Sequence, residues 1–493
     1  MPLPIALHTT AQVRALDRYA IESLGIPGYS LMKRAGEAAL RFMRARWPTA
    51  YRIGIVCGGG NNGGDGYVLA RFAQAAGLTV TVFAAAPVER LRDDAKQAYE
   101  DLKASGVLAE PFDAGKLADC EIVVDALLGT GLSADVRDDL AQVIRGMNAS
   151  GKPIYSLDVP SGLDADIGLA RSVAVRADCT VTFVGAKVGL LIGDGPDYTG
   201  SLLFDDLGIS PPPLAQFEPP LTRVIDAEIT IALPRRSRAA HKGDFGRVVL
   251  IGGGIGMPGA PRLAGEAALR VGAGVVIVAT APQNVAAISA GCPELICVPV
   301  DATDAIGEIM SRAELVAIGP GLGQGAWAKA VFEAFLESRT PAVLDADALN
   351  LLAATPAPSA PRNWILTPHP GEAGRLLGVG TDVIQRDRGA ALAALVERYR
   401  CTVVLKGAGT LIGAPGRTPG ICERGNPGMA SAGMGDVLTG VIAGIYAQCR
   451  DLWMAARAGV QAHALAGDIA ARGGKRGLLA SDLIRELRAC VNS

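Results

Sequence analysis

Short apolar runs alternate with helical patterns along most of the chain, and many of these runs end in glycine or an acid. In residues 10–47, Val13, Leu16, Ala20 and Leu24 recur at helical spacing, which predicts helices before the first strand. Strands alternating with helices indicate βαβ units and a mostly parallel sheet, and so an α/β protein. In the first half we predict strands over 52–57, 79–84, 121–125, 153–158 and 179–184, with helices over 67–76 and 95–105.

The alternation stops at residues 210–220, where five of eleven positions are proline. Prolines this dense exclude a helix or a central strand, so a domain boundary is expected here. The pattern restarts after Leu221, with strands predicted over 247–251, 274–279, 315–318, 342–345, 364–367, 402–406 and 410–413. We therefore predict one domain over residues 1–212, a proline-rich linker over 213–221, and a second, larger α/β domain over 222–493.

The composition narrows the class of protein. The chain is 49% hydrophobic, with 47 basic and 49 acidic residues, so it has no basic excess to suggest nucleic acid or a membrane surface as partner. It has no run of about 18 apolar residues, so no membrane span is expected. The nine cysteines form no CxxC pair and the first eight residues lack signal-peptide features. A cytoplasmic location is therefore expected.

The first predicted strand leads into Cys57-Gly-Gly-Gly-Asn-Asn-Gly-Gly-Asp-Gly66, which formally fits the dinucleotide fingerprint. An NAD-dependent dehydrogenase needs an acid at the end of the next strand to bind ribose, and that strand ends Phe83-Ala-Ala-Ala-Pro87. The same test fails for a second such pattern at Gly254, Gly256 and Gly259. The first loop is therefore interpreted as a phosphate or dinucleotide loop without dehydrogenase function, or else as a tight glycine turn.

Acids follow two more strands of the first half. Asp125 begins Asp-Ala-Leu-Leu-Gly-Thr-Gly, and Asp158 lies in Leu-Asp-Val-Pro-Ser-Gly-Leu-Asp-Ala-Asp. Because ligands bind outside the carboxyl ends of strands in open α/β sheets, these loops are expected to converge. Asn62, Asp125 and Ser161 are hard oxygen donors on three such loops, a plausible set for a hard cation. Each of them alone would equally suit a turn or a helix cap.

These three motifs resemble the NAD(P)H-hydrate epimerase family over roughly residues 10–210. The resemblance implies a Rossmann-like three-layer domain, a potassium ion at Asn62, Asp125 and Ser161, and Asp158 as the acid/base group. It also implies substrate contacts from Asn61, Asn62, Gly63, Gly64, Asp65, Gly129, Thr130, Gly131, Leu132, Ser133, Ala134, Asp135 and Asp158.

The second half contains a glycine-rich stretch, Asn426-Pro-Gly-Met-Ala-Ser-Ala-Gly-Met-Gly-Asp-Val-Leu-Thr-Gly440, followed by an apolar, helix-like run. Free amides and the dipole at a helix N-terminus favour phosphate. A carboxylate at the same place would repel phosphate. Asp436 is therefore better explained as a base beside a reacting phosphoryl group.

Other polar residues of this half also follow predicted strands. Asp345 and Asp347 end one strand, and Gly323 closes a glycine loop after another. His369 lies between two prolines, which favours a ligand role over a structural one. Lys406 precedes Gly-Ala-Gly, which suits a nucleotide phosphate; an ordinary lysine at a strand end is the alternative.

With Ala432-Gly-Met-Gly-Asp436, these features resemble the ribokinase-like fold. They resemble ADP/ATP-dependent NAD(P)H-hydrate dehydratases more closely, over about 223–490, through His241-Lys-Gly-Asp-Phe-Gly246, Gly259-Ala-Pro-Arg-Leu-Ala-Gly-Glu-Ala-Ala-Leu-Arg270 and the stretch 426–436. The resemblance implies Mg²⁺, ADP or ATP as co-substrate, and Asp436 as catalytic base. It implies hydrate contacts from Ala260, Gly323, His369 and Asp436, and nucleotide contacts from Lys406, Gly407, Ala408, Gly409, Thr410 and Gly435.

Both resemblances together imply a bifunctional repair enzyme for hydrated NADH and NADPH. The first domain would interconvert the R and S hydrates. The second would dehydrate the S form with ADP or ATP, releasing AMP or ADP and phosphate. One alternative is a ribokinase-like small-molecule kinase with a fused nucleotide-binding domain, which would release a stable phosphorylated product. Another is a non-enzymatic nucleotide sensor or scaffold, which would not need Asp158 and Asp436. We expect small-molecule partners and a homo-oligomer.

Overall fold

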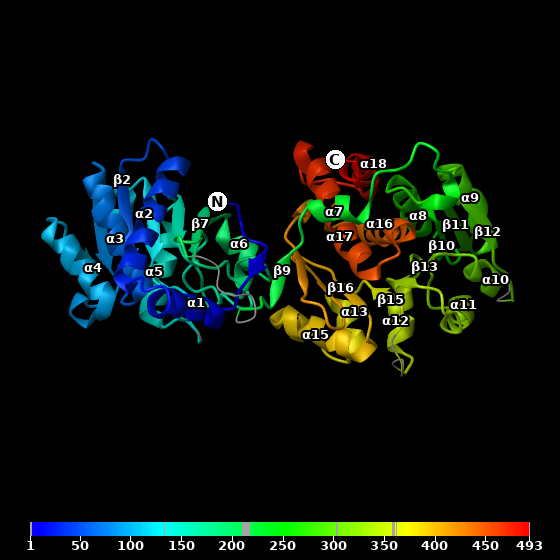
Figure 1. Ribbon diagram of the computed structural model, residues 1–493, viewed down its shortest axis with the longest axis horizontal. Helices are drawn as coiled ribbons and strands as arrows, with labels where there is room; N and C mark the ends of the chain where they lie inside the picture. The colour runs from blue at the N-terminus through cyan, green and yellow to red at the C-terminus, as the bar shows by residue number, and fades with distance from the viewer. Residues whose placement is uncertain are drawn as a thin grey trace. The chain divides into compact units, whose positions relative to one another are not determined.

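The chain divides into two compact units, Met1–Leu221 and Thr222–Ser493 (Figure 1). The computed structural model describes residues 2–132, 134–209, 217–301, 304–356, 360 and 362–492. The proline-rich linker predicted over 213–221 therefore falls in part on residues 213–216, which lie outside the described residues. Each unit is built on a sheet of its own.

The first unit has a seven-stranded sheet whose neighbouring strands are all parallel. In sheet order the strands are β4 (Ala109–Pro111), β3 (Thr79–Ala84), β2 (Arg52–Cys57), β5 (Ile122–Ala126), β6 (Ile154–Leu157), β7 (Cys179–Phe183) and β8 (Ser201–Asp205). A short strand β1 (Ala6–Leu7) precedes the helices α1 (Thr10–Glu22), α2 (Gly28–Arg46), α3 (Asn61–Ala75), α4 (Asp93–Ala104), α5 (Asp138–Ala149) and α6 (Gly195–Thr199).

Helices cover both faces of this sheet, because its strands are apolar on both. Ile53 and Ile55 of β2 point to one face, where they pack in a cluster with residues of α2, α3 and α4. Val56 points to the other, where it packs with α5. Successive side chains of a strand alternate between faces, so one apolar run supplies both layers. The predicted Rossmann-like three-layer architecture is confirmed. The order reverses between β2 and β5, and such a switch point is where open α/β sheets bind ligands.

The second unit is built on a larger mixed sheet. In sheet order its strands are β9 (Leu221–Arg223), β18 (Gly420–Cys422), β17 (Thr410–Gly413), β16 (Thr402–Leu405), β15 (Trp364–Leu366), β14 (Ala342–Leu344), β13 (Leu315–Ile318), β10 (Arg247–Ile251), β11 (Val275–Thr280) and β12 (Ile296–Pro299). Only the pairs of β17 with β16 and β18 are antiparallel among the pairings described here. The switch point lies between β10 and β13.

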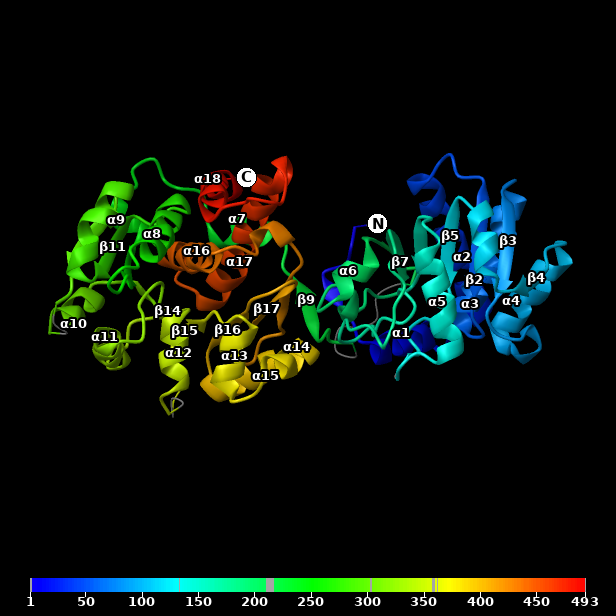
Figure 2. The ribbon, with the colours of Figure 1, turned by 180° about the vertical axis from the view of Figure 1, so that it is seen from behind.

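Helices again lie on both faces of the second sheet (Figures 1 and 2). One side holds α7 (Ala227–Ala232), α8 (Gly259–Arg270), α16 (Met434–Cys449), α17 (Leu452–Ala470) and α18 (Ala480–Cys490), which share a buried cluster with the strands. The other side includes α11 (Ala326–Leu336), α12 (Asp347–Ala353), α13 (Pro370–Leu377) and α15 (Arg388–Tyr399). The remaining helices are α9 (Val285–Gly291), α10 (Asp304–Ser311) and α14 (Thr381–Arg386).

Helices α16 and α8 approach each other through small residues. A Cβ added at Gly440 would lie 1.9 Å from the carbonyl oxygen of Ala264, and one at Gly444 would lie 2.6 Å from the carbonyl oxygen of Ala268. Since nonbonded atoms do not come so close, only glycine permits this separation of the two helices. The packing fixes the N-terminus of α16 over the carboxyl edge of the sheet.

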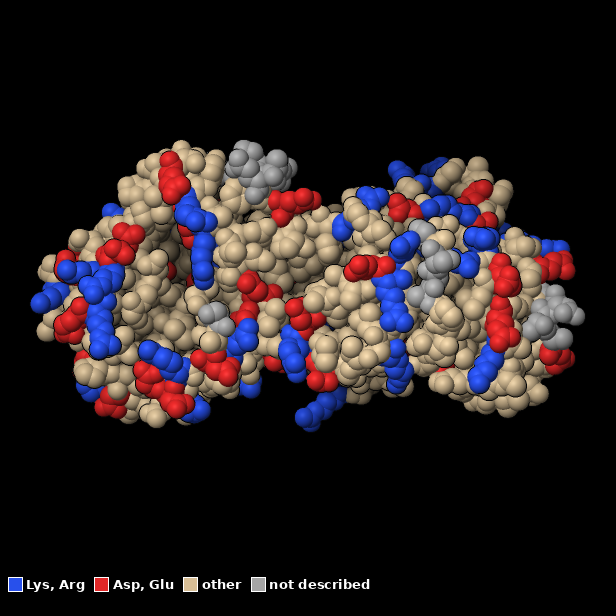
Figure 3. Space-filling model, turned by 90° about the horizontal axis from the view of Figure 1, so that it is seen from below, with Lys and Arg blue, Asp and Glu red and all other residues tan. Residues whose placement is uncertain are grey.

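The surface carries mixed charge. On the face drawn in Figure 3, basic and acidic side chains are interspersed over both units, as a net charge of −2 would suggest. Within the described part of the chain, no helix is long and apolar enough to cross a membrane.

Candidate active sites

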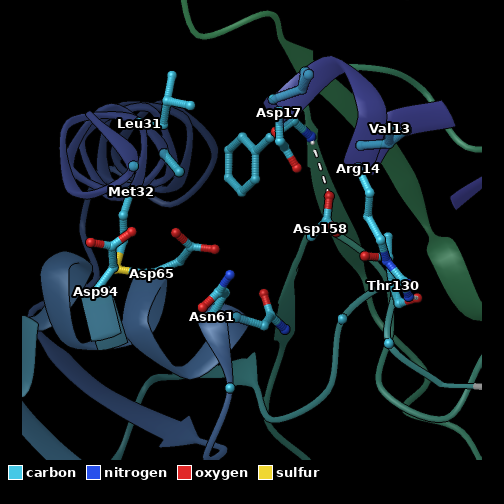
Figure 4. A pocket seen from close by; sticks show the side chains of 18 of the residues that line it. Val13, Arg14, Asp17, Leu31, Met32, Asn61, Asp65, Asp94, Thr130 and Asp158 are labelled. Carbon is cyan, nitrogen blue, oxygen red and sulfur yellow. Dashed lines mark hydrogen bonds between the residues drawn. The ribbon is translucent and has the colours of Figure 1, made fainter. Parts of the chain in front are cut away.

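A cavity of about 590 Å³ opens at the switch point of the first sheet. Its wall includes Asn61, Asn62, Asp65, Gly129, Thr130, Gly131, Leu132 and Asp158, all expected to contact substrate (Figure 4). Gly63 and Gly64 lie behind the wall, in the first turn of α3. There an added Cβ would meet the Gly58 carbonyl oxygen at 2.1 Å and the Met32 side chain at 2.6 Å, respectively. Ala134 and Asp135 are not among the lining residues, and Ser133 lies outside the described residues.

Asp125 ties the end of β5 to strand β6 and the loop that follows it, beneath this cavity. Its carboxylate is fully buried at the end of β5 and accepts bonds from the Ser156 hydroxyl (2.8 Å), the Ser161 hydroxyl (2.5 Å) and the Ser161 amide (2.8 Å). Burial raises the pKa of Asp125, while these hydrogen bonds oppose the rise.

Asn62 supplies an unsatisfied oxygen beside the same loops. Its amide nitrogen donates to the Leu128 carbonyl at 3.0 Å, and the Leu128 amide donates to the Ser161 hydroxyl at 2.7 Å. The Asn62 Oδ1 atom is buried and accepts no hydrogen bond from the described residues. A buried acceptor without a donor is costly unless an ion or water meets it. This oxygen-only set therefore fits a hard cation.

Asp158 lies at the carboxyl end of β6 with a positive φ of 65°. Such a conformation is strained for a residue with a side chain and is often found at functional sites. Its carboxylate forms an ion pair with Lys187, whose side chain is 1% exposed. The Lys187 ammonium also donates to the Thr182 hydroxyl at 3.0 Å and the Phe183 carbonyl at 2.9 Å. The strained backbone and the buried ion pair hold the carboxylate at the cavity wall.

Three further carboxyls line the cavity, Asp17 from α1, Asp65 from α3 and Asp94 from α4 (Figure 4). Burial raises the pKa of Asp17 to about 6, and the nearby Asp158 carboxylate adds to the rise while Lys187 opposes it. Burial also raises the pKa of Asp65 well above its usual range, with Asp158 and Asp17 contributing. The cavity thus holds an ion-paired carboxylate and two carboxyls that favour the protonated form.

The second site is organised around Asp345, at the end of β14. Its carboxylate accepts bonds from the Thr367 hydroxyl (2.8 Å), the Lys406 ammonium (2.6 Å) and the Thr439 hydroxyl (2.9 Å). These partners come from the ends of β15 and β16 and from α16. The Lys406 ammonium also lies 3.7 Å from a Glu372 carboxylate oxygen. Although burial alone lowers the pKa of Lys406, the carboxylates of Asp345 and Glu372 raise it above its usual value.

Asp436 stands in the first turn of α16, next to this network. The apolar run after Asp436 predicted a helix that starts beyond this residue. The helix instead begins at Met434, so Asp436 lies inside it. Gly433, with a φ of 89°, makes the turn into the helix. Burial raises the pKa of Asp436 to about 7, with Asp345 adding to the rise and Lys406 opposing it. A Cβ added at Gly435 would lie 3.4 Å from the Lys406 nitrogen, so the loop and the lysine adjoin.

The predicted hydrate contacts Ala260 and Gly323 meet at the switch point of the second sheet. The Gly323 amide, at a φ of 78°, donates to the Asp347 carboxylate at 2.8 Å. A Cβ added at Gly321 would lie 3.2 Å from the Cβ of Ala260, at the start of α8. The loops after β10 and β13 therefore lie against each other, with Asp347 holding one of them.

His369 has a structural partner as well as an exposed edge. Its Nδ1 atom accepts bonds from the Gly371 amide (3.0 Å) and the Glu372 amide (3.3 Å), so it caps α13. Burial lowers the pKa of His369, and Lys406 adds to the effect. Since Nδ1 accepts, the neutral ring carries its proton on Nε2, which lies 3.4 Å from a Glu372 carboxylate oxygen; the side chain is half-exposed, so a ligand can also reach this edge.

The loop over residues 406–410 is held from below by Arg388. This buried guanidinium donates to the carbonyls of Leu405 (3.1 Å), Lys406 (3.2 Å) and Ala408. Gly407 has a φ of 143° and Gly409 a φ of 63°, and the Thr410 hydroxyl donates to the Gly407 carbonyl at 3.0 Å. Arg388 therefore fixes the loop's backbone.

Sequence reasoning did not find Asp17, Lys187 or Arg388. Lys187 follows β7 within four residues, so the strand-end argument that selected Asp125 and Asp158 could have included it. Asp17 and Arg388 lie in amphipathic helices, where a polar residue usually faces solvent. The sequence carries no local signal for either.

Comparisons with known proteins cover both units. Residues 28–189 match the family described as YjeF-related protein N-terminus, and residues 248–489 match the family described as NAD(P)H-hydrate dehydratase. An NAD(P)H-hydrate dehydratase from Bacillus subtilis, co-crystallized with ATP and Mg²⁺, is 29% identical, with a TM-score of 0.51, over 55% of this chain and 97% of that one. The predicted ribokinase-like fold of the second unit is thereby confirmed.

Two curated relatives match the whole chain. The bifunctional NAD(P)H-hydrate repair enzyme Nnr of Coxiella burnetii is 48% identical over 99% of both chains. The enzyme of the same name from Escherichia coli is 43% identical over 99% of this chain and 95% of its own. These matches do not favour the small-molecule kinase. The chain belongs to the family of bifunctional NAD(P)H-hydrate repair enzymes, which join an epimerase unit to a dehydratase unit that depends on ADP or ATP.

Proposed function

We propose that the first cavity epimerises the R and S hydrates and that Asp158 is its acid/base group. The hydrate carries a hydroxyl on C6 of the nicotinamide ring, beside N1. Asp158 is supported for this role by its place at the cavity wall, its strained backbone and its ion pair with Lys187. Substrate contacts would come from residues 61–65 and 129–135.

A potassium ion would lie beneath the substrate, held by Asn62, Asp125 and Ser161. The unpartnered Asn62 oxygen supports this assignment, because it points to a ligand that the protein itself does not supply. Bound there, the cation would supply positive charge to the substrate and tie the three loops together. Its effect can be separated from that of Na⁺ by titrating each ion.

The second unit would transfer phosphate to the S hydrate. Asp436 takes the proton of the C6 hydroxyl, the oxygen attacks the terminal phosphorus, and the bond to the AMP or ADP leaving group breaks. Phosphate then leaves C6 with its electron pair while a proton leaves C5, which restores the double bond. A base with a pKa of about 7 suits this role at neutral pH. The amides of Ala432–Gly435 would stabilise the transferring group, and such donors are worth about 3–4 kcal/mol each.

The co-substrate would lie along residues 406–410 and Gly435, with Ala260, Gly323 and His369 on the hydrate side. The described residues include no cluster of three or more His, Cys, Asp or Glu able to hold a metal. We therefore expect Mg²⁺ to arrive on the nucleotide phosphates, as it commonly does, and to use at most one or two carboxylates of the chain. The choice between ADP and ATP is left to the assay.

The single observation that carries the two-site assignment is a carboxyl beside the strand ends of each unit, Asp158 on the cavity wall of the first and Asp436 next to the Asp345 network of the second. The test follows absorbance at 340 nm with mixed hydrates, Mg²⁺ and either nucleotide. Asp436→Asn should abolish recovery of NADH while R and S still interconvert. With Asp158→Asn, NADH should be recovered from the S form only. Loss of both activities in either variant would contradict two independent sites.

A cytoplasmic location is supported by the cysteines, all nine of which are free thiols. The homo-oligomer stays a prediction, and light scattering after size exclusion tests it.

A further inference from the structure

Helix α1 holds one carboxyl of the first cavity in a fixed place. The Thr10 amide and hydroxyl donate to the Asp166 carboxylate at 2.6 and 2.9 Å, and the Arg14 guanidinium donates to the Thr130 carbonyl at 2.7 Å. Val13 is buried on the same helix. These contacts anchor α1 to the loops after β5 and β6. Asp17, one turn beyond Val13, therefore faces the cavity from an anchored helix.

No structural partner accounts for the Asp17 side chain. Among the described residues, no hydrogen bond or salt bridge to its carboxyl is found, although the Asp158–Lys187 pair lies close by (Figure 4). A carboxyl shielded from water is normally retained with donors around it, and Asp17 is half-buried. Asp17 instead turns toward the space that the substrate would fill, which points to a role in binding or chemistry.

Epimerisation at C6 requires two proton-transfer groups of opposite state. In one direction, a base takes the hydroxyl proton, a C=O bond forms, and the C6–N1 bond breaks with its electron pair passing to N1. An acid protonates N1 at the same time. Rotation about the C5–C6 bond turns the aldehyde, and the reverse transfers close the ring on its other face. All atoms and electrons are recovered, so no co-reactant is needed.

We propose that Asp17 is a second catalytic residue of the epimerase site, the acid that gives its proton to N1 as Asp158 takes the hydroxyl proton. The inference rests on the proposed role of Asp158. The other charged groups that line the cavity are Lys187, Asp158, Asp65 and Asp94, together with Arg14 on the helix of Asp17 itself. Burial and the neighbouring Asp158 and Asp17 carboxyls raise the pKa of Asp65 and favour its protonated form. Asp17, with a pKa of about 6, can give and regain its proton near neutral pH.

The experiment uses the full chain and pure R hydrate without nucleotide, so that the dehydratase unit is idle, and follows the S form by chromatography. Asp17→Asn should lower kcat about 100-fold, the low end of the range for general acids, with KM little changed. In the unsubstituted chain, kcat/KM should fall as pH rises through about 6, and this limb should be absent from the variant. Asp17→Glu should restore part of the rate. Glu22→Gln, an exposed change on the same helix, should have no effect.

Each other outcome overturns the proposal. A rate within threefold of normal in Asp17→Asn would remove Asp17 from the chemistry. A higher KM at unchanged kcat would make it a binding residue, and a retained limb near pH 6 would assign the titration to another group. Asp158→Asn is measured beside it. If the Asp158→Asn variant still epimerises the hydrate, the proposed site itself is wrong. If Asp158→Asn is inactive but Asp17→Asn still epimerises the hydrate, only the inference about Asp17 is wrong.

Discussion

Replacing Asp436 by Asn should stabilise the folded C-terminal unit at neutral pH, although it removes the catalytic base. Burial and the neighbouring Asp345 carboxylate raise the pKa of Asp436 from 3.8 to about 7. The folded state therefore binds this proton more tightly than the unfolded chain does. The stability due to the protonated carboxyl is complete below about pH 4 and is lost as the pH rises to about 7. Asn keeps the shape of the side chain and never ionises.

The magnitude follows from the two pKa values. At 1.36 kcal/mol for each pH unit between 3.8 and about 7, ionised Asp436 lowers the free energy of unfolding by about 4 kcal/mol at pH 8. At pH 5 the Asp436 carboxyl is still protonated in most folded molecules. The free energy of unfolding is then lowered by only about 2 kcal/mol. The variant should therefore exceed the unsubstituted chain by a margin that grows by about 2 kcal/mol between these two pH values.

The assay is denaturant unfolding of both full-length chains at pH 5 and pH 8, followed by tryptophan fluorescence. Three of the four tryptophans, Trp327, Trp364 and Trp453, lie in Thr222–Ser493 and report on that unit. Asp382→Asn serves as control, because that side chain is 73% exposed and its effect should not change with pH. A margin that is the same at both pH values, or a variant that is less stable at pH 8, would refute the reasoning.

Three further predictions test other parts of the molecule. Gly440→Ala should lower the free energy of unfolding by about 3 kcal/mol, because its Cβ would lie 1.9 Å from the Ala264 carbonyl oxygen; Gly473→Ala, which meets nothing within 4 Å, is the control in the same thermal melts. Exchanging K⁺ for tetramethylammonium should remove epimerisation but leave dehydration of the S form, and equal loss of both would contradict the cation site. Arg388→Leu should raise the KM for ADP or ATP at least about tenfold, since lost charge-assisted bonds to the 406–410 loop cost about 1.5–3 kcal/mol each. A KM that stays the same would show that the loop holds its shape without Arg388.

The sequence predicted the parts of the fold that repeat a strong local pattern. The strands at Thr79–Ala84 and Arg247–Ile251 have the predicted bounds, because each is rich in β-branched and apolar residues. Short strands such as β4 and β18 were not predicted, since three residues are too few to show a period. For the candidate sites, Asp125, Asp158 and Asp345 were selected because they follow predicted strands, and the structure places them at or next to strand ends. Asp17 and Arg388 were missed because their roles arise only from the packing of their helices against distant loops.

The hydrogen bonds to the Asp345 carboxylate limit how the second unit can open. This carboxylate binds groups from β15, β16 and α16 as well as ending β14, so one buried acceptor ties four elements together. A buried network of this kind opens as a whole or not at all, because releasing one donor leaves the others poorly satisfied. Amide protons at these strand ends and in the first turn of α16 should therefore exchange with solvent at a common, slow rate. Ligand entry and product release then fall to segments outside this framework, such as the exposed residues 255–257 in the loop after β10, which can move while the framework stays closed.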